Sequence, residues 1–489
     1  MSQAERSRAV AARRPDAPLH LVFVPFLARS HFVPLAAKAA ASSAASRAEH
    51  EVAAATATTA AIVTTAHFAA LAPASVPVHA APLRCPGGHE DFSLLPDEAS
   101  FAPTFFAAAE AALAPALTAA IRAHDGRRPV AVVSDAVLYW APRVARDCGV
   151  PHVTFHTIGA FAAAAMVALH LYRPEVVLTG PFAVPGGFPH PVRVNRAQVN
   201  EEALANLPLF RAAEAQSCAV VFNSVSALES DFAAYYQSQL AGTPKKVFLV
   251  GPTRAAVSPP PRAVTERDPI LQWLDGRDAG TVVYVCFGST CALGESQLRE
   301  LAAGLRASGR PFVWTIPTPP RGDGTGSCTE REERASSHGM VVAGRWAPQA
   351  EILAHHAVGG FVTHCGWNSV LEAVSAGVPL ATWPLRAEQF LNEVFLVEVL
   401  RVGVRVREVA RESDLEAVVP ADAVARAVGR LMGGDGQDEE AVAARRARSR
   451  ELGAAARAAV AEGGSSCGDW ARLVYELKSF HGRDSDPQT

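Results

Sequence analysis

The sequence has no long run of charges of one sign, no closely paired cysteines and no long uninterrupted apolar run. Its 45 basic and 48 acidic residues leave a formal net charge of −3 over 489 residues. This near-neutral balance removes any electrostatic case for nucleic acid or an anionic membrane as the main partner. The eight cysteines are scattered, without a C-x-x-C pair or cysteine–histidine metal spacing, so we expect no structural metal and a reducing, cytoplasmic location.

The amino-terminal residues show no clear targeting signal. Residues 1–18 carry four arginines among Ala and Ser, but Glu5 and Asp16 interrupt them, and no apolar segment follows closely. The apolar stretch 159–170 is too short to span a bilayer. We therefore expect a disordered tail at 1–18 and no signal peptide or stable membrane anchor.

Strands and helices are expected to alternate along the chain. Buried strands are predicted at 19–26, 130–135, 281–290 and 359–364, and Pro34 is placed in the first turn of the helix after the first strand. Residues 253–269, which contain SPPPR, have the composition of a linker. The pattern predicts an α/β protein with two doubly wound, Rossmann-like domains that face a cleft. We place the first domain at 19–252, the linker at 253–269, the second domain at 270–460 and a final helix with a tail at 461–489.

The most informative stretch runs from Trp346 to Gln389. A strand at 359–364, a tight Cys-Gly-Trp turn and a helix at 368–376 follow one another, and Gly377 is placed as the helix stop. Free backbone N–H groups and the positive end of the helix dipole then meet at one point, which favours a phosphate. Ser369 and Glu372 also have the spacing of a capping box, so they could instead hold the helix end.

The same stretch resembles a known family signature. It contains W-x-P-Q at 346–349, H-C-G-W-N-S at 364–369, Glu372, G-V-P at 377–379 and the pair Glu388-Gln389. This pattern is similar to the 44-residue signature box of plant secondary-product UDP-glycosyltransferases (glycosyltransferase family 1), and the chain looks closest to the phenolic, flavonoid and terpenoid O-glucosyltransferase branch. The resemblance covers most of the chain and implies the GT-B fold, with the final helix packed back on the first domain.

The resemblance also implies the residues of a UDP-sugar site. It assigns the base and ribose to Trp346, Ala347, Gln349 and Glu372, the diphosphate to His364, Asn368 and Ser369 with Gly366 in the turn beside them, and the sugar to Trp367, Glu388, Gln389 and Thr157. Ser289 lies in a Gly-Ser-Thr turn that could present N–H groups to a phosphate or could be an ordinary turn. A final Gln in the box accompanies glucose in this family, so UDP-glucose is the expected donor.

Two further residues match the catalytic pair of the family. His31 stands in Ser30-His31-Phe32-Val33-Pro34, where the family has Gly-His-x-x-Pro, and Asp135 ends a predicted strand. Taken alone, His31 could be structural and Asp135 could cap a helix. The resemblance implies that His31 is the general base and that Asp135 fixes its tautomer, as the acid does in a Ser-His-Asp triad.

The expected function is therefore inverting transfer of glucose from UDP-glucose, as co-substrate and without a metal, to a hydroxyl of a small lipophilic acceptor. Aromatic residues that core packing would explain equally well are candidates for the acceptor cleft: Phe101, Phe105, Phe106, Tyr139, Trp140 and Phe161. We expect a monomer. Two alternatives stay open, namely the same fold with another donor sugar or a C- or N-linkage, and a non-catalytic binding protein for a UDP-sugar or a small molecule.

Overall fold

The computed structural model describes most of the chain. The described residues are 18–45, 58–84, 88–95, 98–124, 130–174, 180–240, 245–253, 267–288, 293–316, 338–408, 413–434, 436 and 438–483. The predicted tail at 1–18, except for residue 18, and most of the predicted linker therefore lie outside them, as does Ser289.

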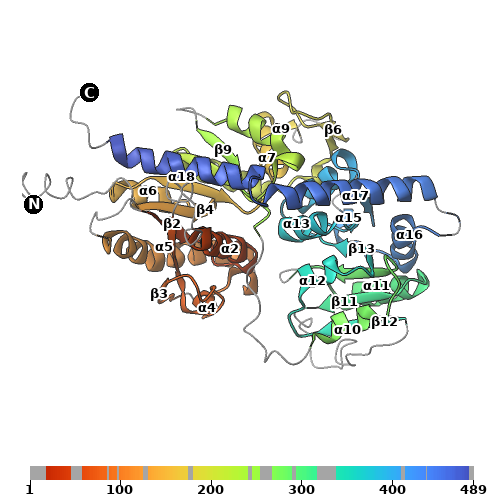
Figure 1. The fold of residues 1–489 in the computed structure, drawn as a ribbon. Coiled ribbons are helices and arrows are strands. Elements are labelled where there is room, and N and C mark those ends of the chain that lie inside the picture. The colour runs from red at the N-terminus through yellow and green to blue at the C-terminus, as the bar shows by residue number, and fades with distance from the viewer. Residues whose placement is uncertain are drawn as a thin grey trace, which may run out of the picture.

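The first half is built on a parallel sheet of seven strands in the order β3-β2-β1-β4-β5-β8-β9 (Figure 1). Its strands are β1 Leu19–Val24, β2 Thr58–Thr65, β3 Val78–Ala81, β4 Val130–Asp135, β5 His152–His156, β8 Ala219–Phe222 and β9 Lys246–Leu249. The runs at β1 and β4 are buried along their whole length, as expected for strands covered on both faces. The strand predicted at 19–26 ends two residues earlier, at Val24.

The second half is built on a parallel sheet of six strands in the order β12-β11-β10-β13-β14-β15. Its strands are β10 Val282–Cys286, β11 Phe312–Ile316, β12 Gly339–Ala343, β13 Val358–Thr363, β14 Leu380–Thr382 and β15 Gly403–Arg405. A short antiparallel hairpin of β6 Phe182–Ala183 and β7 Arg193–Val194 belongs to neither sheet. The prediction of two parallel α/β units is confirmed.

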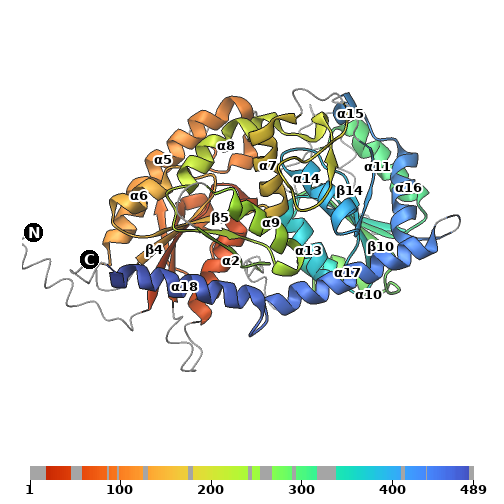
Figure 2. The ribbon, with the colours of Figure 1, turned by 90° about the horizontal axis from the view of Figure 1, so that it is seen from above.

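Helices pack on both faces of the sheets (Figure 2). In the first half they are α2 Arg29–Ala45, α4 Ala66–Ala69, α5 Glu98–Arg122, α6 Ala141–Asp147, α7 Ala160–Tyr172, α8 Glu201–Glu214 and α9 Ser226–Ser238. In the second half they are α10 Pro269–Asp275, α11 Glu295–Ala307, α12 Gln349–Ala354, α13 Trp367–Ala376, α14 Gln389–Val394, α15 Ser413–Glu416, α16 Ala421–Met432 and α17 Glu439–Ala459. Three single turns are η1 Phe92–Leu94, η3 Arg196–Gln198 and η4 Phe395–Val399.

One described helix, α5, is long and apolar enough over residues 102–122 to cross a membrane by length and composition alone. The side chains of Phe105, Ala109, Leu113 and Leu117 recur every four residues and are fully buried. They form a single face of the helix, and this face joins the core of the first sheet.

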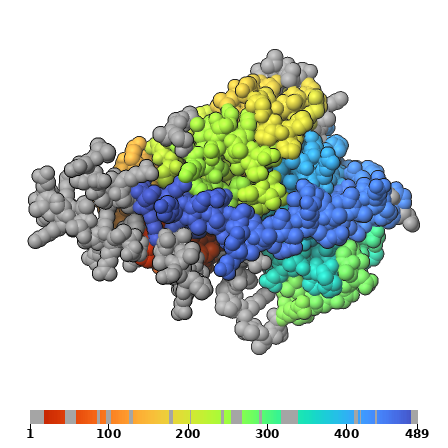
Figure 3. All heavy atoms as spheres, turned by 45° about the horizontal axis from the view of Figure 1, so that its top comes forward, coloured from red at the N-terminus to blue at the C-terminus, as the bar shows by residue number. Residues whose placement is uncertain are grey.

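The last helix, α18 Ser465–Arg483, returns to the first half of the chain (Figures 2 and 3). It contacts β1 and β9, and Asp469 accepts a hydrogen bond of 2.9 Å from the backbone N–H of Leu249 in β9. Trp470 lies under the ammonium group of Lys38, which is 4.1 Å from the ring centroid. Burial lowers the pKa of Lys38 to about 8. Helices α17 and α18 thus run along one side of the molecule and bridge both halves.

Candidate functional site

Each of the two sheets has one point at which its strand order reverses. In the first sheet the order runs outward from β1 and β4, and in the second sheet from β10 and β13. The carboxyl ends of the strands at such a switch point form a crevice in open α/β sheets. His31 follows β1 and Asp135 ends β4, while Gly288 follows β10 and His364 follows β13. Topology alone therefore brings these four positions to the two crevices.

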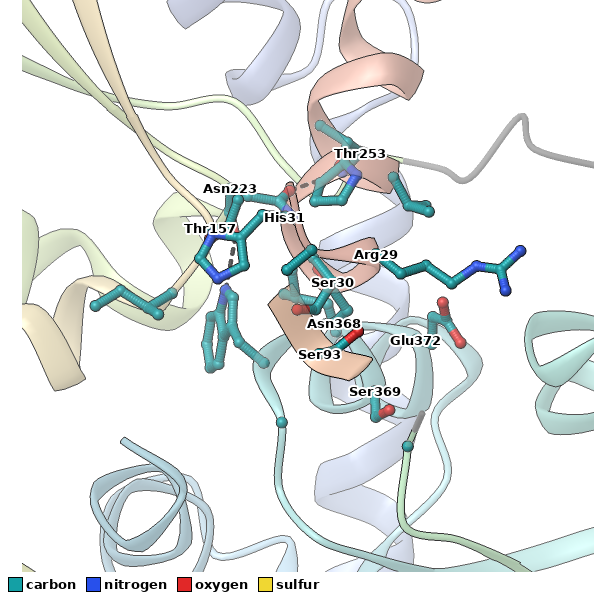
Figure 4. A pocket seen from close by; sticks show the side chains of 18 of the residues that line it. Arg29, Ser30, His31, Ser93, Thr157, Asn223, Thr253, Asn368, Ser369 and Glu372 are labelled. Carbon is teal, nitrogen blue, oxygen red and sulfur yellow. Dashed lines mark hydrogen bonds between the residues drawn. The ribbon is translucent and has the colours of Figure 1, made fainter. Parts of the chain in front are cut away.

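A single cavity of about 2060 Å3 lies between the halves and is lined by residues of both. His31 and Thr157 line it from the first half, and Trp346, His364 and Glu372 line it from the second. Figure 4 shows His31 and Thr157 from one half and Ser369 and Glu372 from the other around this space. The cavity is large enough for two drug-sized ligands, since a pocket for one such ligand measures about 300–1,000 Å3.

His31 and Asp135 form a hydrogen-bonded pair at the wall of the cavity. His31 Nδ1 lies 2.9 Å from Asp135 Oδ2 and 3.0 Å from the hydroxyl of Thr157. The other oxygen of Asp135, Oδ1, accepts the backbone N–H of Val137 at 3.1 Å. The carboxylate is 1% exposed, whereas the imidazole is 25% exposed. The Nδ1 proton is thereby directed to Asp135, which leaves Nε2 as the basic nitrogen.

The charge environment makes His31 a stronger base than a free imidazole. Burial lowers its pKa, but the negative charge and hydrogen bond of Asp135, together with the charge of Glu388, outweigh burial and raise the pKa above 6.5. Glu388 belongs to the second half of the chain. The pKa of the base is thus set partly by the half that carries the expected donor site.

Pro34 explains how the turn that carries His31 meets the second half. Helix α2 begins at Arg29, so Pro34 lies in its second turn and not in the first, as predicted. A proline has no N–H to give to the carbonyl four residues earlier, which is that of Ser30. The side-chain amide of Asn368 donates to this carbonyl oxygen at 2.6 Å. Asn368, an expected diphosphate residue, is therefore linked to the backbone directly before His31.

The expected phosphate site lies at the amino terminus of α13. This helix starts at Trp367 after Gly366, and no side chain caps it. Because the helix begins at Trp367, Ser369 and Glu372 lie inside it, and the capping-box hypothesis for these two residues is wrong. Gly377 ends the helix in the left-handed conformation, with φ of 74°, as predicted. The uncapped N–H groups and the helix dipole favour an anion at this end.

His364 is held between two glycines beside this terminus. A Cβ atom on Gly366 would lie 2.4 Å from His364 Nε2, and one on Gly288 would lie 2.8 Å from it. Burial, and then the positive charge of Arg386, lower the pKa of His364 to about 4. The imidazole is therefore neutral near pH 7 and can offer an N–H to a phosphate oxygen. Cys365, between His364 and Gly366, takes a φ of 66°, which is uncommon for a residue other than glycine.

Three side chains assigned to the ribose and phosphate lie together. Gln349 Nε2 is 2.9 Å from Glu372 Oε2 and 3.0 Å from Ser369 Oγ. Burial raises the pKa of Glu372, while the Gln349 hydrogen bond opposes that rise. A buried carboxylate held in this way is a good acceptor for sugar hydroxyls.

Trp346, the expected base platform, is unusually accessible. Its side chain is 48% exposed, and it lines the cavity together with Ala347. The carbonyl oxygen of Ala347 accepts the N–H of Gln349 at 2.9 Å. The base-pairing role assigned to the Ala347 backbone stays a prediction.

Trp367 is placed differently from its neighbours. Its side chain is 3% exposed, and the indole N–H donates to the carbonyl of Asn223 in the first half at 2.8 Å. A Cβ atom on Gly159 would lie 3.0 Å from the indole ring. Trp367 lines the cavity, and its one polar side-chain group joins the two halves of the molecule. The sugar-binding role that the resemblance implies for it stays a prediction.

Glu388 and Gln389, the expected sugar residues, follow a strained turn. Ala387 has a φ of 53°, and such strain in a residue other than glycine is typical of functional sites. Gln389 Oε1 accepts the backbone N–H groups of Leu385 at 2.9 Å and Arg386 at 3.1 Å. Burial raises the pKa of Glu388, and the positive charges of His31 and Arg386 are among the effects that oppose it.

An aromatic wall lies on the first-half side of the cavity. Phe26, Phe92, Phe106 and Tyr139 line it, and Phe26 stacks on Phe106 with a centroid distance of 5.2 Å. Phe26 also meets the ring of His31 edge-on at 5.3 Å. An apolar acceptor on this wall would therefore lie beside the base.

Only part of this wall was predicted. Phe106 and Tyr139 line the cavity, but Phe105, Trp140 and Phe161 are buried in the cores at 0%, 1% and 0% exposure. The side chain of Phe101 lies outside the described residues, as does Ser289.

Phe26, Phe92, Arg29 and Asn223 were missed as cavity residues. Phe26 lies in the segment that joins β1 to α2 and Arg29 is the first residue of α2, so the switch-point rule could have pointed to both. Phe92 and Asn223 come from a single helical turn and from the end of β8, and neither carried a signal.

These features define a class. Two doubly wound sheets that share one cavity at their carboxyl ends, with a His–Asp pair on one wall and an uncapped helix terminus on the other, are those of a glycosyltransferase with the GT-B fold. The structure of UGT73P12 from Glycyrrhiza uralensis, in complex with glycyrrhetinic acid 3-O-monoglucuronide, superposes with a TM-score of 0.81. The two are 28% identical, and the match covers 96% of this chain and 97% of the other.

Comparison with known sequences agrees with this assignment to the glycosyltransferases. Residues 270–420 match the family described as UDP-glucoronosyl and UDP-glucosyl transferase. UDP-glycosyltransferase 73B4 of Arabidopsis thaliana is 37% identical over 72% of this chain and 74% of its own length. UDP-glucose flavonoid 3-O-glucosyltransferase 7 of Fragaria ananassa is 37% identical over 73% of this chain and 76% of its own length. The chain belongs to the plant secondary-product UDP-glycosyltransferase family.

Proposed function

We propose that the protein transfers glucose from UDP-glucose to a hydroxyl group of a small lipophilic acceptor, with inversion at the anomeric carbon. The observation that carries the proposal is the His31–Asp135 pair, with a distance of 2.9 Å, on a cavity wall that faces the donor box of the other half. The likeness to the Fragaria enzyme, whose name specifies UDP-glucose and a flavonoid 3-hydroxyl, supports the donor and the acceptor class.

The proposed mechanism is a single displacement. Nε2 of His31 removes the proton of the acceptor hydroxyl as its oxygen attacks the anomeric carbon, and Asp135 stabilises the imidazolium that forms. The bond from the anomeric carbon to the diphosphate oxygen breaks, and negative charge gathers on UDP. The α13 terminus, His364 and Asn368 stabilise this charge, and such positioned donors are worth about 3–4 kcal/mol each in other enzymes.

The donor half of the site is proposed to follow the order of the box. Trp346 and Ala347 hold the base, Gln349 and Glu372 hold the ribose, and Glu388 and Gln389 read the sugar. Thr157 contacts Nδ1 of His31, so we place Thr157 between the general base, His31, and the sugar of the donor. Ser289 is kept as a phosphate residue on the sequence pattern alone.

Several further properties are proposed with this function. The helix terminus and the neutral His364 can stabilise the leaving diphosphate, so the reaction is expected to need no divalent metal. Within the described residues, no group of three or more His, Cys, Asp or Glu side chains is arranged to hold a metal ion. We also propose a cytoplasmic monomer without a stable membrane anchor, with domains at 19–252 and 270–460 and a final helix that completes the first.

The test is a turnover and binding experiment on His31→Ala. With UDP-glucose and a panel of phenolics, flavonoids and terpenoids, the wild-type protein should add one hexose to an acceptor, as detected by mass spectrometry, and EDTA should not change the rate. His31→Ala should lower kcat by about 10²–10⁴-fold and keep its UDP affinity in calorimetry.

The outcomes separate the alternatives. Loss of both activity and UDP binding would give His31 a structural role. Donor competition with other UDP-sugars, and linkage analysis of the product by NMR, would expose a different sugar or a C- or N-linkage. UDP-glucose binding without turnover on any acceptor would favour a binding protein.

A further inference from the structure

A residue of the other half lies over one face of the Trp346 ring. The guanidinium carbon of Arg29, the first residue of α2, lies 4.2 Å from the centroid of the Trp346 ring. Both residues line the cavity. Arg29 extends from the start of α2 away from His31 (Figure 4), so its charge is directed to the donor side.

On that face, this contact competes with the base-stacking role that the proposed function gives to Trp346. A uracil base and a guanidinium are both flat groups that stack on an indole at van der Waals distance. They cannot occupy the same part of the ring at once. A donor base that stacks on this face of Trp346 must therefore displace Arg29.

The guanidinium of Arg29 lacks a close counter-charge among the described residues. Within the described part of the chain, no carboxylate forms an ion pair with Arg29. Burial lowers the pKa of its guanidinium, and the more distant charge of Asp91 only partly offsets that effect. A half-buried cation in this position gains from any anion that enters the cavity.

The backbone of Arg29 is held next to the expected diphosphate site. Its neighbour Ser30 accepts the hydrogen bond of 2.6 Å from Asn368, at the amino terminus of α13. The start of α2 is therefore fixed against the phosphate end of the donor box, while the long side chain of Arg29 reaches to its base end. The first turn of α2 therefore contacts the donor box at both its base end and its phosphate end.

We propose that Arg29 is a donor-binding residue with two positions, stacked on Trp346 in the free protein and paired with the diphosphate once the uracil base has replaced it on the indole. This inference rests on the proposed function. It predicts that Arg29 opposes binding of the base and favours binding of the phosphates.

Calorimetry with uridine and with UDP separates these two effects. In Arg29→Ala, uridine should bind about two- to fivefold more tightly, because a cation–π contact at an exposed ring, worth about 0.5–1 kcal/mol, no longer competes. UDP should bind about tenfold more weakly, because a charge-assisted contact is lost. Arg29→Lys should keep most of the UDP affinity, since it keeps the charge.

Arg426→Ala is the matched control. Arg426 is exposed on α16 and pairs with Asp422 in its own helix, so both affinities should stay at the wild-type values. If Arg29→Ala shifted uridine and UDP affinity in the same direction, or left UDP affinity unchanged, the inference would be overturned. Wild-type protein that binds neither ligand would instead overturn the proposed function, and this inference with it.

Discussion

Asp135 uses its two oxygens for different purposes. Oδ1 is fixed by the N–H of Val137, and this contact orients Oδ2 toward His31 Nδ1. The carboxylate is thus held in place by the backbone of the loop that follows β4. Its charge is the main influence that raises the pKa of His31, against the opposing effect of burial.

This charge predicts the pH dependence of the reaction. Only the neutral imidazole can accept a proton, so kcat/KM should fall as the pH drops through a pKa above 6.5. In Asp135→Asn the stabilising charge is gone, so the acidic limb should move to lower pH while kcat falls by about 10²-fold or more. The check is a pH profile of kcat/KM for both proteins. An acidic limb that stays in place would assign it to another group.

The glycines beside His364 give a second prediction at this scale. Gly366→Ala should weaken UDP binding by about tenfold or more, because its Cβ would lie 2.4 Å from His364 Nε2 and would push a diphosphate donor out of place. Calorimetry measures the UDP affinity, and thermal unfolding measures any change in stability separately.

Gly294→Ala is the matched control. Gly294 also precedes a helix, α11, with a similar extended backbone, but a Cβ there would meet nothing within 4 Å. Equal loss of UDP affinity in both variants would show that the His364 contact is irrelevant.

At the scale of the element, Pro34 removes one hydrogen bond from α2. The Ser30 carbonyl is then free to accept a hydrogen bond from Asn368 in the other half. In Pro34→Ala the restored N–H can bond the Ser30 carbonyl and compete with Asn368. Stability should rise, by up to about 3 kcal/mol on helix propensity, while kcat/KM falls about fivefold for the loss of one hydrogen bond. Thermal unfolding and steady-state kinetics on the same preparation test both parts.

Pro115→Ala is the comparison for this change. Pro115 also lies inside a helix, α5, but it is not among the residues that line the cavity. This variant should change stability alone. A drop in kcat/KM of the same size would mean that Pro34 acts only through general helix stability.

The sequence predicted best those strands that are apolar and buried along their whole length. β4 and β13 are short apolar runs between polar turns, and their positions agree with the prediction to within a residue. The start of α13 was misjudged by one residue, and Ser369 and Glu372 have the spacing of a capping box that the helix does not use. Pro34 was assigned to a first turn because proline is favoured there, but in the protein a contact from the other half overrides that preference.

Most of the predicted site residues are clustered in the sequence, whereas the distant His31–Asp135 pair was predicted from the resemblance to the family. The donor box is one segment, so its members were named together. Arg29 on Trp346 and Asn223 on Trp367 join residues far apart in the chain, and no local pattern encodes such pairs. The aromatic wall was predicted only in part. Periodicity does not distinguish a cavity face from a core face: Phe105 is buried in the core, whereas Phe106 lines the cavity.

At the scale of the whole molecule, the first sheet depends on residues near the end of the chain. In Asp469→Ala the N–H of Leu249 in β9 would lose its acceptor, which should cost about 1–3 kcal/mol of stability and lower the thermal midpoint. Asp422→Ala, on an exposed face of α16, should cause no measurable change. An unchanged midpoint for Asp469→Ala would show that α18 is held by its apolar contacts alone.

The path of α18 has a consequence for the order in which the protein is made. The six strands of the second sheet come from one unbroken part of the chain, from Val282 to Arg405, whereas the first sheet needs Leu473, Val474 and Leu477 to cover its core. Domains generally form as units while the ribosome moves from the amino terminus onward. Here the half that is translated first must wait, with part of its apolar face open, until the whole second sheet and then residues 473–477 have been translated.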